Sequence, residues 1–349
     1  SMQQLPTNIE ITDAIVESLA SYLGESGFRN IGVLVDNNTA VHCHPLVEPA
    51  LPKHFVINIA SGEKHKDLST CNGIWEEMTY HQMDRGSLLI NLGGGVIGDM
   101  GGFCAATYKR GIQFINIPTT LLAQVDASLG GKLGVDFQGF KNHIGMFKEP
   151  AKVIINPNFL ITLPTAELRS GFAEVIKHAL ISDLPYWTKI QTAGLEDQPW
   201  DEHIAHSVIT KHQIVSEDPW EKSVRKTLNF GHTVGHAIER HYLHEPDPLL
   251  HGEAIAIGMI CESYLSSKKQ GLSSGNLNEI SNYLLQIFGK VRMPNEELNA
   301  IAKNALQDKK NHHGQIICTL LEDIGIPTYE TSVSLNEIEE SLEFYNSLG

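Results

Sequence analysis

SLLINLGGGVIGD, residues 87–99, gives the strongest indication of the fold. Its first six residues, four of them leucine or isoleucine, have the length and composition of a strand buried on both faces of a parallel sheet. Gly93, Gly95 and Gly98 then follow the spacing G-x-G-x-x-G, and the residues after them are compatible with a helix. In this position glycines let the backbone approach a pyrophosphate at a helix N-terminus. The stretch favours a nucleotide site over an ordinary glycine-rich turn.

The rest of the first half alternates in the same way. Further buried strands are expected at residues 31–36, 54–59, 114–118 and 152–156, with an amphipathic segment at 9–23 and a helix at 68–83. This alternation predicts a mainly parallel sheet with both faces covered. We therefore expect an α/β protein whose first domain, residues 1–157, is a Rossmann-like nucleotide-binding domain.

The pattern changes after Pro157. Residues 315–321 look like a strand, but helices are expected at residues 165–181, 200–217, 224–242, 252–269, 273–288, 295–307 and 335–347. Residues 158–349 are therefore predicted to form a mainly α-helical second domain.

Composition limits the class of protein. The chain has 349 residues, 42% of them hydrophobic and 19% charged, as in ordinary globular proteins. A net charge of −15 argues against nucleic acid or an anionic membrane as a partner. The sequence contains no apolar run long enough to cross a bilayer. The five cysteines lie far apart without a C-x-x-C pair, which predicts reduced, mostly buried thiols and a cytoplasmic location.

A second informative stretch is RKTLNFGHTVGH, residues 225–236. In a continuous helix, Arg225, Asn229, His232 and His236 would share one face, because they lie at offsets of 0, 4, 7 and 11 residues. The arginine fork suits a phosphate or carboxylate, and histidines four residues apart can bind one metal ion. A solvated surface helix is the alternative interpretation.

Two residues outside this stretch favour the binding site. His251 opens the next predicted helix, and Glu174 lies in the segment AEVIK. Imidazole and carboxylate groups together are typical metal ligands.

Polar residues of the first half lie at strand ends and in loops. Asp36 suits a ribose hydroxyl or a helix cap, and Thr119 with Thr120 suits a cofactor contact or an N-cap. Glu63 and Lys66 follow a strand, at the edge where α/β sheets bind ligands. Candidate ligands for anions or substrate oxygens are Arg110, Asp126, Lys132, Lys141 and Asn142, and for each of the two lysines a solvated loop side chain is the alternative.

Seven motifs follow one another along the chain. They are GGGVIGD, GFCAATYKRG, PTTLLAQVDASLGGKLGV, KNHIGMF, LPTAELRSGFAEVIKHALI, LNFGHTVGHAIE and LLHGEAIAIGM. Over residues 31–320 their order resembles the 3-dehydroquinate synthase family. The resemblance implies a lyase that converts 3-deoxy-D-arabino-heptulosonate 7-phosphate (DAHP) to 3-dehydroquinate in the shikimate pathway. It also implies NAD and a divalent metal ion, zinc or cobalt, as cofactors, a site in the cleft between the two domains, and a homodimer.

The resemblance assigns roles to individual residues. The implied metal ligands are Glu174, His232 and His251. The residues implied to contact NAD are Asp36, Asn38, Ser61, Gly62, Glu63, Lys64, His65, Lys66, Gly95, Val96, Ile97, Gly98, Asp99, Thr119, Thr120, Phe159, Leu160, Ile161 and Thr162. The implied substrate residues are Asp126, Lys132, Asn142, Lys177, Lys211, Arg225, Asn229 and His236. Lys132 and Lys141 also match NAD contacts of bacterial members, Arg110 matches an arginine that reaches the neighbouring subunit's substrate, and either Lys309 or Lys310 is expected to face substrate.

One departure lies before Lys141. GVDFQGFKN stands where the family usually has GVNHPLGKN, so Phe140 replaces a typical glycine and is expected to reshape the loop. Another sugar-phosphate cyclase and a metal-dependent polyol dehydrogenase that releases NADH remain as alternatives. A non-catalytic binding module is disfavoured, because it would not need NAD, metal and anion ligands together.

Overall fold

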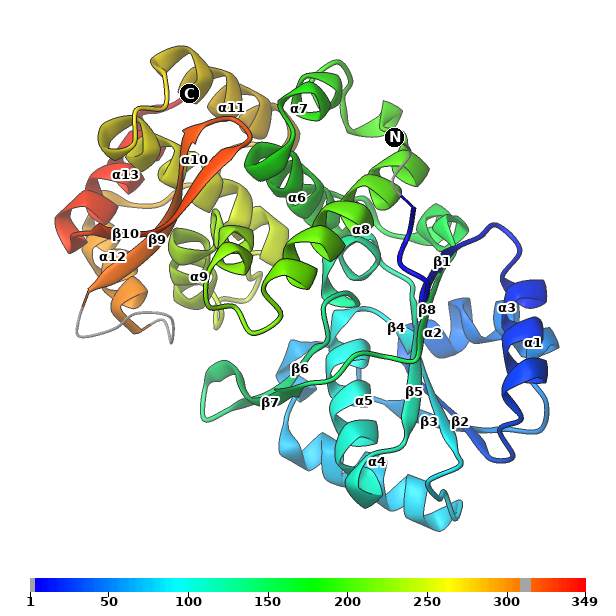
Figure 1. The fold of residues 1–349 in the computed structure, drawn as a ribbon. Helices are drawn as coiled ribbons and strands as arrows, with labels where there is room; N and C mark the ends of the chain where they lie inside the picture. The colour runs from blue at the N-terminus through cyan, green and yellow to red at the C-terminus, as the bar shows by residue number, and fades with distance from the viewer. Residues whose placement is uncertain (1–3, 308–314) are drawn as a thin grey trace. The chain divides into compact units, whose positions relative to one another are not determined.

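The computed structural model describes residues 4–307 and 315–349 (Figure 1). The chain divides into two compact units. The first comprises Ser1–Pro164 with Trp200–His212, and the second comprises Thr165–Pro199 with Gln213–Gly349. Lys309 and Lys310 lie outside the described residues. Among the described helices, none is both long enough and apolar enough to span a membrane.

The first unit is built on a parallel sheet, as predicted. From one edge to the other its strands are β1 (Ile9–Ile11), β8 (Lys152–Ile155), β5 (Gln113–Pro118), β4 (Leu88–Gly93), β2 (Ile31–Asp36) and β3 (Phe55–Ile59). Every neighbouring pair is parallel. All of β4 is buried, which explains why four of its six residues are leucine or isoleucine.

The strand order of this sheet reverses once. From β2 the chain adds β3 on one side, and it then builds β4, β5 and β8 on the other side. The reversal therefore falls between β2 and β4. Open α/β sheets bind ligands beyond the carboxyl ends of the strands at such a point. Here those ends are Asp36 and Gly93.

Helices cover both faces of the sheet. They are α1 (Ile15–Ser26), α2 (Asn37–His42), α3 (His44–Val47), α4 (Leu68–Tyr80) and α5 (Gly95–Thr107). The amphipathic segment predicted at 9–23 contains β1 as well as α1, because a strand of three residues is too short to show a period of its own.

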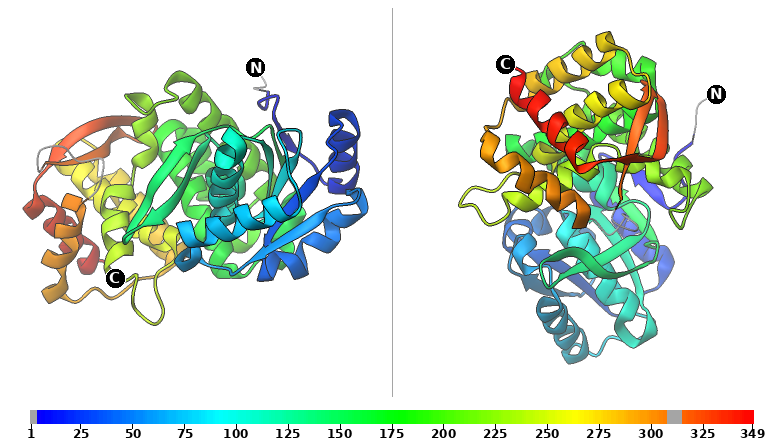
Figure 2. Two further views of the ribbon diagram at one scale, coloured as in Figure 1. Left: turned by 90° about the horizontal axis from the view of Figure 1, so that it is seen from below. Right: turned by 90° about the vertical axis from the view of Figure 1, so that its left-hand side faces the viewer.

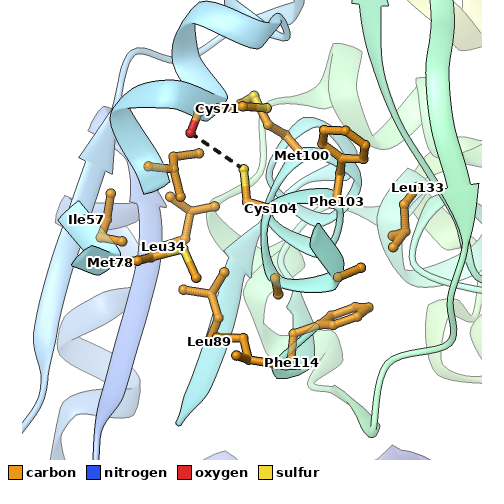
Figure 3. Close-up of a cluster of buried hydrophobic side chains, with 14 of the residues drawn as sticks. Leu34, Ile57, Cys71, Met78, Leu89, Met100, Phe103, Cys104, Phe114 and Leu133 are labelled. Atoms are coloured by element: carbon orange, nitrogen blue, oxygen red, sulfur yellow. Dashed lines mark hydrogen bonds between the residues drawn. The ribbon is translucent and has the colours of Figure 1, made fainter. Parts of the chain in front are cut away.

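Side chains of one strand alternate between the two faces. Leu34 of β2 points into the cluster formed with α4 and α5, beside Ile57 and Leu89 (Figure 3). Val33 and Val35 belong to the opposite cluster, which α1 covers. In the first cluster the thiol of Cys104 donates to the carbonyl oxygen of Cys71 at 4.0 Å. All five cysteines are buried and none forms a disulfide, which agrees with the prediction of reduced, mostly buried thiols.

A hairpin stands where the sequence predicted loops. Strands β6 (Lys132–Phe137) and β7 (Phe140–Phe147) pair antiparallel, so the loop prediction around Lys132 and Lys141 was wrong. Gln138 and Gly139 form the turn with φ angles of 51° and 80°. Two successive positive φ values match the turn that suits the twist of a two-residue hairpin. Phe140 pairs with Phe137 beside this turn.

The second unit is mostly helical, as predicted. Its helices are α6 (Thr165–Ser182), α7 (Leu184–Ile190), α9 (His232–His241), α10 (His251–Lys269), α11 (Ser274–Phe288), α12 (Leu298–Asn304) and α13 (Leu335–Ser347). Helix α8 (Trp200–Glu217) starts in the first unit and ends in the second. A hairpin of β9 (Ile316–Asp323) and β10 (Ile326–Val333) packs beside α10, where the Leu321 amide donates to Ser266 Oγ at 2.8 Å (Figure 2). Strand β10 was not predicted.

Candidate metal and nucleotide sites

The stretch 225–236 is not one helix, and the predicted shared face is wrong. Val224–Asn229 form a short 3₁₀ helix, and α9 begins only at His232. Between them Gly231 adopts a left-handed conformation with φ of 80°. A Cβ there would lie 2.5 Å from Met259 Cγ on α10, so glycine is required both for conformation and for space. The break makes His232 the first residue of α9.

Glu174, His232 and His251 converge in the second unit. Glu174 comes from α6 and is fully buried, while the two histidines are the first residues of α9 and α10. Glu174 Oε1 lies 3.1 Å from His232 Nε2 and 3.1 Å from His251 Nε2. Ligand atoms bound to zinc at about 2.0–2.1 Å in a tetrahedron are separated by roughly 3.3 Å. The spacing of these three residues fits a divalent ion.

The other ring nitrogen of each histidine has a partner. His232 Nδ1 lies 3.0 Å from the carbonyl oxygen of Phe230, and His251 Nδ1 lies 3.4 Å from a carboxylate oxygen of Glu239. Metal-binding histidines commonly donate this second N–H to a carbonyl or carboxylate, which orients the ring and leaves Nε2 for the metal. Sequence reasoning missed Glu239, although its position three residues after His236 was an available signal.

Charges at the centre favour the ligand forms of these residues. Burial alone would raise the pKa of Glu174, but Lys177 at 2.6 Å and the two histidines hold it well below its usual value. Burial lowers the pKa of His232, which favours the neutral imidazole. An ionised carboxylate and neutral imidazoles are the forms that bind a metal.

The remaining substrate candidates of this unit have defined positions. The ring of His236 lies 5.2 Å from that of His232 and 5.9 Å from that of His251, measured between centroids. Arg225 is 2% exposed, and its Nη1 donates to the carbonyl oxygen of Pro219 at 2.9 Å. Asn229 Nδ2 lies 3.4 Å from Glu221 Oε1. The structure thus brings His236 to the metal ligands, whereas the substrate roles of all three remain predictions.

The glycine motif of the first unit forms the start of α5. Gly93 ends β4, and Gly95 is the first helical residue. A Cβ at Gly95 would lie 3.1 Å from Ala127 Cβ, and one at Gly94 would lie 3.2 Å from Thr120 Cγ2. The turn therefore packs closely on the neighbouring segment. Val96, Ile97, Gly98 and Asp99 follow within the first turns. The Gly98 amide already donates to the Gly94 carbonyl oxygen at 3.1 Å, so the amides that suit a phosphate are those before Gly98.

Lys66 connects three parts of the first unit. It is 3% exposed, and its Nζ donates to Asp99 at 2.8 Å and to Asn142 Oδ1 at 2.6 Å. Burial would lower its pKa, but Asp99 and Glu63 raise it above the usual value. The lysine thereby joins the end of β3 to α5 and to the β6–β7 hairpin. Asp136 also belongs to this group, because its amide donates to the Lys66 carbonyl oxygen and its Oδ1 accepts from the Asn142 amide.

Other NAD candidates have local structural roles. Asp36 Oδ1 accepts from the amides of Asn38 and Thr39 at 2.9 Å, so the helix-cap alternative is confirmed for that oxygen. Thr120 Oγ1 accepts from the Ala123 amide at 3.1 Å, as in an N-cap. In the segment Pro157–Thr162, Phe159 and Leu160 are buried, and Ile161 is 80% exposed. Ser61, Gly62, Lys64 and His65 lie in the turn after β3.

The anion candidates of the first unit differ in exposure. Lys211 Nζ donates to Asp126 Oδ1 at 2.7 Å, which confirms that these two candidates lie together. Lys132 and Lys141 are exposed on the hairpin, and Arg110 is exposed with a positive φ of 67°. Exposed cations of this kind can move to meet a ligand, and their roles stay predictions.

Comparison with known proteins identifies relatives along nearly the whole chain. Residues 56–170 match the family model of the 3-dehydroquinate synthase N-terminal domain, and residues 171–311 match that of the C-terminal domain. A 3-dehydroquinate synthase of Parabacteroides distasonis is 39% identical over 342 residues, 97% of each chain. A solved 2-deoxy-scyllo-inosose synthase, complexed with carbaglucose-6-phosphate, NAD+ and Co2+, superimposes with a TM-score of 0.86 at 25% identity over 99% of each chain. A 2-epi-5-epi-valiolone synthase of Streptomyces hygroscopicus with NAD+ and Zn2+ shares the fold, with a TM-score of 0.85 and 24% identity over 99% of this chain and 98% of its own.

Proposed function

The chain belongs to the 3-dehydroquinate synthase family, and we propose that it converts DAHP to 3-dehydroquinate and phosphate in the shikimate pathway. The observation that carries the proposal is the Glu174–His232–His251 centre, with its ligand atoms 3.1 Å apart, within a chain that matches synthases over nearly its whole length. The reaction is a carbon–oxygen lyase reaction, since phosphate leaves as the carbon skeleton is rearranged.

NAD and a divalent ion are the proposed cofactors. When bound, NAD accepts and returns a hydride, and the metal ion polarises the substrate oxygens, as in other metal-assisted reactions. The residues proposed to bind NAD lie at the carboxyl ends of the strands and at the start of α5. They belong to the domain of residues 1–157 and to the segment Phe159–Thr162 that follows it. The residues proposed for the metal lie on residues 158–349.

The protein groups have mainly binding and orienting roles in this proposal. Glu174, His232 and His251 hold the ion, and Lys177 keeps the Glu174 carboxylate ionised. Arg225, through its planar fork, and His236 bind the substrate's anionic groups. Fixed donors of this kind accelerate a reaction by holding the substrate in the reactive geometry, without many side chains acting as acid or base.

One assay tests the function directly. Purified protein is stripped of metal and NAD, and phosphate release from DAHP is followed with each cofactor restored alone and together. We expect release only with both, with catalytic turnover at substoichiometric NAD and no net NADH. Release without NAD, or NADH accumulating in proportion to product, would contradict the proposal.

The same assay separates the alternative enzymes. A cyclase of the inosose or valiolone type would release phosphate faster from glucose 6-phosphate or sedoheptulose 7-phosphate than from DAHP. A polyol dehydrogenase would form NADH from glycerol without phosphate release. We expect DAHP to be the preferred substrate by kcat/KM.

We also propose a homodimer and a cytoplasmic location. The five free, buried cysteines support a reducing compartment. In the dimer, exposed Arg110 contributes to the neighbouring subunit's phosphate site. Light scattering tests the dimer, and an inactive Arg110→Ala variant mixed with an inactive Arg225→Ala variant should regain activity if the arginine acts across the interface.

A further inference from the structure

Glu262 is a buried carboxylate in the middle of α10 that has no place in the proposed reaction. It is 0% exposed. Its Oε1 accepts a hydrogen bond from the Gly231 amide at 3.0 Å, and its Oε2 accepts one from the Val234 amide at 3.0 Å. These amides lie on either side of His232, so the carboxylate holds the start of α9 through its backbone.

Burial of a carboxylate costs several kcal/mol unless its oxygens are well satisfied, so its presence here calls for an explanation. Two amide donors, one to each oxygen, match the acceptor-only chemistry of an ionised carboxylate. The first amides of a helix lack partners within the helix and usually bond to an N-cap side chain. Gly231 is the N-cap of α9 and has no side chain, so Glu262 supplies the oxygens from α10.

One peptide group, between Phe230 and Gly231, connects Glu262 to the candidate metal ligand His232. The Gly231 amide and the Phe230 carbonyl belong to the same peptide bond. The amide donates to Glu262 Oε1, and the carbonyl oxygen lies 3.0 Å from His232 Nδ1. Hydrogen bonds in such a chain polarise one another. A negative charge on Glu262 therefore strengthens the carbonyl as an acceptor and makes His232 a better electron donor at Nε2.

The helix itself provides a second reason. The N-terminus of α9 carries a partial positive charge of about half a unit, which opposes a divalent cation bound by its first residue. The Glu262 carboxylate lies at that terminus and offsets the opposing charge. His251 also has a carboxylate partner on the side away from Glu174, because a Glu239 oxygen lies 3.4 Å from its Nδ1.

We propose that Glu262 is a positioning residue of the metal centre, acting on His232 through the Phe230–Gly231 peptide as Glu239 acts on His251 by direct contact. The inference rests on the proposed function in one respect: Glu174, His232 and His251 must hold a divalent ion. Glu262 touches neither the substrate nor the ion, and its effect is on how tightly the ion is held.

The test measures metal affinity rather than activity. Full-length Glu262→Gln keeps the size of the side chain but loses the charge and one acceptor. Metal-stripped protein is titrated with Co2+ in competition with a chromophoric chelator. Loss of a hydrogen-bonded partner behind a ligand typically weakens metal binding about 10–100-fold, and we expect a change of that size. Ser263→Ala, at a buried neighbour on the same helix, is the control and should bind Co2+ as the wild type does.

A second variant distinguishes weaker metal binding from a loss of folding. Glu262→Asp keeps the charge with a shorter reach, and its Co2+ affinity should fall between those of the wild type and Glu262→Gln. A purely structural role would lower the unfolding temperature of the metal-free protein while leaving Co2+ affinity unchanged at temperatures where the variant is folded. Wild-type affinity in folded Glu262→Gln would overturn the inference.

Comparing His251→Ala with the wild type distinguishes failure of the metal assignment from failure of the role proposed for Glu262. If His251→Ala binds Co2+ as tightly as the wild type, the metal assignment is wrong, and the role of Glu262 fails with it. If His251→Ala loses the ion and Glu262→Gln retains full affinity, only the inference about Glu262 fails.

Discussion

Each unit contains a buried lysine beside a carboxylate, and the two pairs behave differently. Lys66 lies 2.8 Å from Asp99 in the first unit, and Lys177 lies 2.6 Å from Glu174 in the second. Burial raises the pKa of Asp99 above its usual value despite Lys66, and the nearby Glu63 carboxylate adds to the effect. Glu174 is more deeply buried, with 0% of its side chain exposed against 18% for Asp99. Its pKa is nevertheless held well below the usual value by Lys177 together with His232 and His251.

The difference shows that one lysine does not by itself hold the pKa of a carboxyl group below its usual value. Two imidazoles contact Glu174 in addition to its lysine, whereas Asp99 shares Lys66 with Asn142. The sum of donors and charges around the carboxylate decides its state. The arrangement that lowers the pKa of Glu174 favours the ionised form that a metal ion would need, while the Lys66–Asp99 pair holds the start of α5 to the end of β3.

Removal of a metal ligand should have the largest effect. His251→Ala is expected to lose the ion and to fall to background activity, a larger loss than the roughly 10–100-fold effects of groups behind the ligands. Elemental analysis and phosphate release from DAHP measure the two losses. A chelator should likewise abolish activity while circular dichroism stays nearly unchanged, because a three-ligand open site is catalytic rather than structural.

His241→Ala is the matched control for this prediction. His241 lies on the same helix as His232, and its Nε2 contacts Glu297 at 3.5 Å. The variant should keep its metal and its activity. Full metal content in His251→Ala would show that the ligand assignment is wrong.

The two lysines themselves should differ in their effects on stability. Removing one partner of a buried ion pair costs about 3–5 kcal/mol when the other charge stays buried, and we expect a loss of this order for Lys177→Met. Lys66→Met should cost less, about 1–3 kcal/mol, because Asp99 can take up a proton and then needs only hydrogen-bond partners. Urea unfolding of both metal-free variants at neutral pH gives the comparison. Equal losses would contradict the contrast drawn between the two carboxylates.

Arg225 tests the anion site that is proposed for the second unit. Arg225→Lys keeps the charge but loses the planar fork. The variant should therefore lose about 1.5–3 kcal/mol of transition-state binding, calculated from the decrease in kcat/KM for DAHP. Lys222→Ala, a change at a nearby lysine with no proposed role, serves as the control. Catalytic efficiency like that of the wild type in Arg225→Lys would remove this residue from the site.

The sequence predicted the features that depend on local pattern. Buried runs such as residues 88–93 predicted the parallel sheet, and the resemblance carried by the motifs indicated the three residues that converge at the candidate metal site. The break before α9 was missed because it depends on the close approach of Met259 on α10, which no local pattern contains. The β6–β7 hairpin was missed because its glycines and lysines have no clear alternation. Glu239 and Glu262 were missed because their role depends on which residues they meet in the folded chain.

The smallest expected effect is on stability and concerns Asp136. This residue lies on β6 of the hairpin, and its backbone amide donates to the Lys66 carbonyl oxygen. Burial and the neighbouring Glu63 carboxylate raise the pKa of Asp136 to about 6. A folded-state pKa above the ordinary value means that the folded protein binds this proton more tightly than the unfolded chain does. The resulting stability is fully present below the unfolded pKa of about 3.9 and is lost as the pH rises through about 6.

Asp136→Asn resembles the protonated form at every pH, since its oxygen can still accept from the Asn142 amide. The variant should therefore be more stable than the wild type at about pH 8 and equally stable near pH 4. Asp136 is partly exposed, so solvent screening limits the gain to about 1 kcal/mol or less. Thermal unfolding of both proteins across this range measures the difference. A difference that stays constant with pH would mean that folding does not raise the pKa of Asp136.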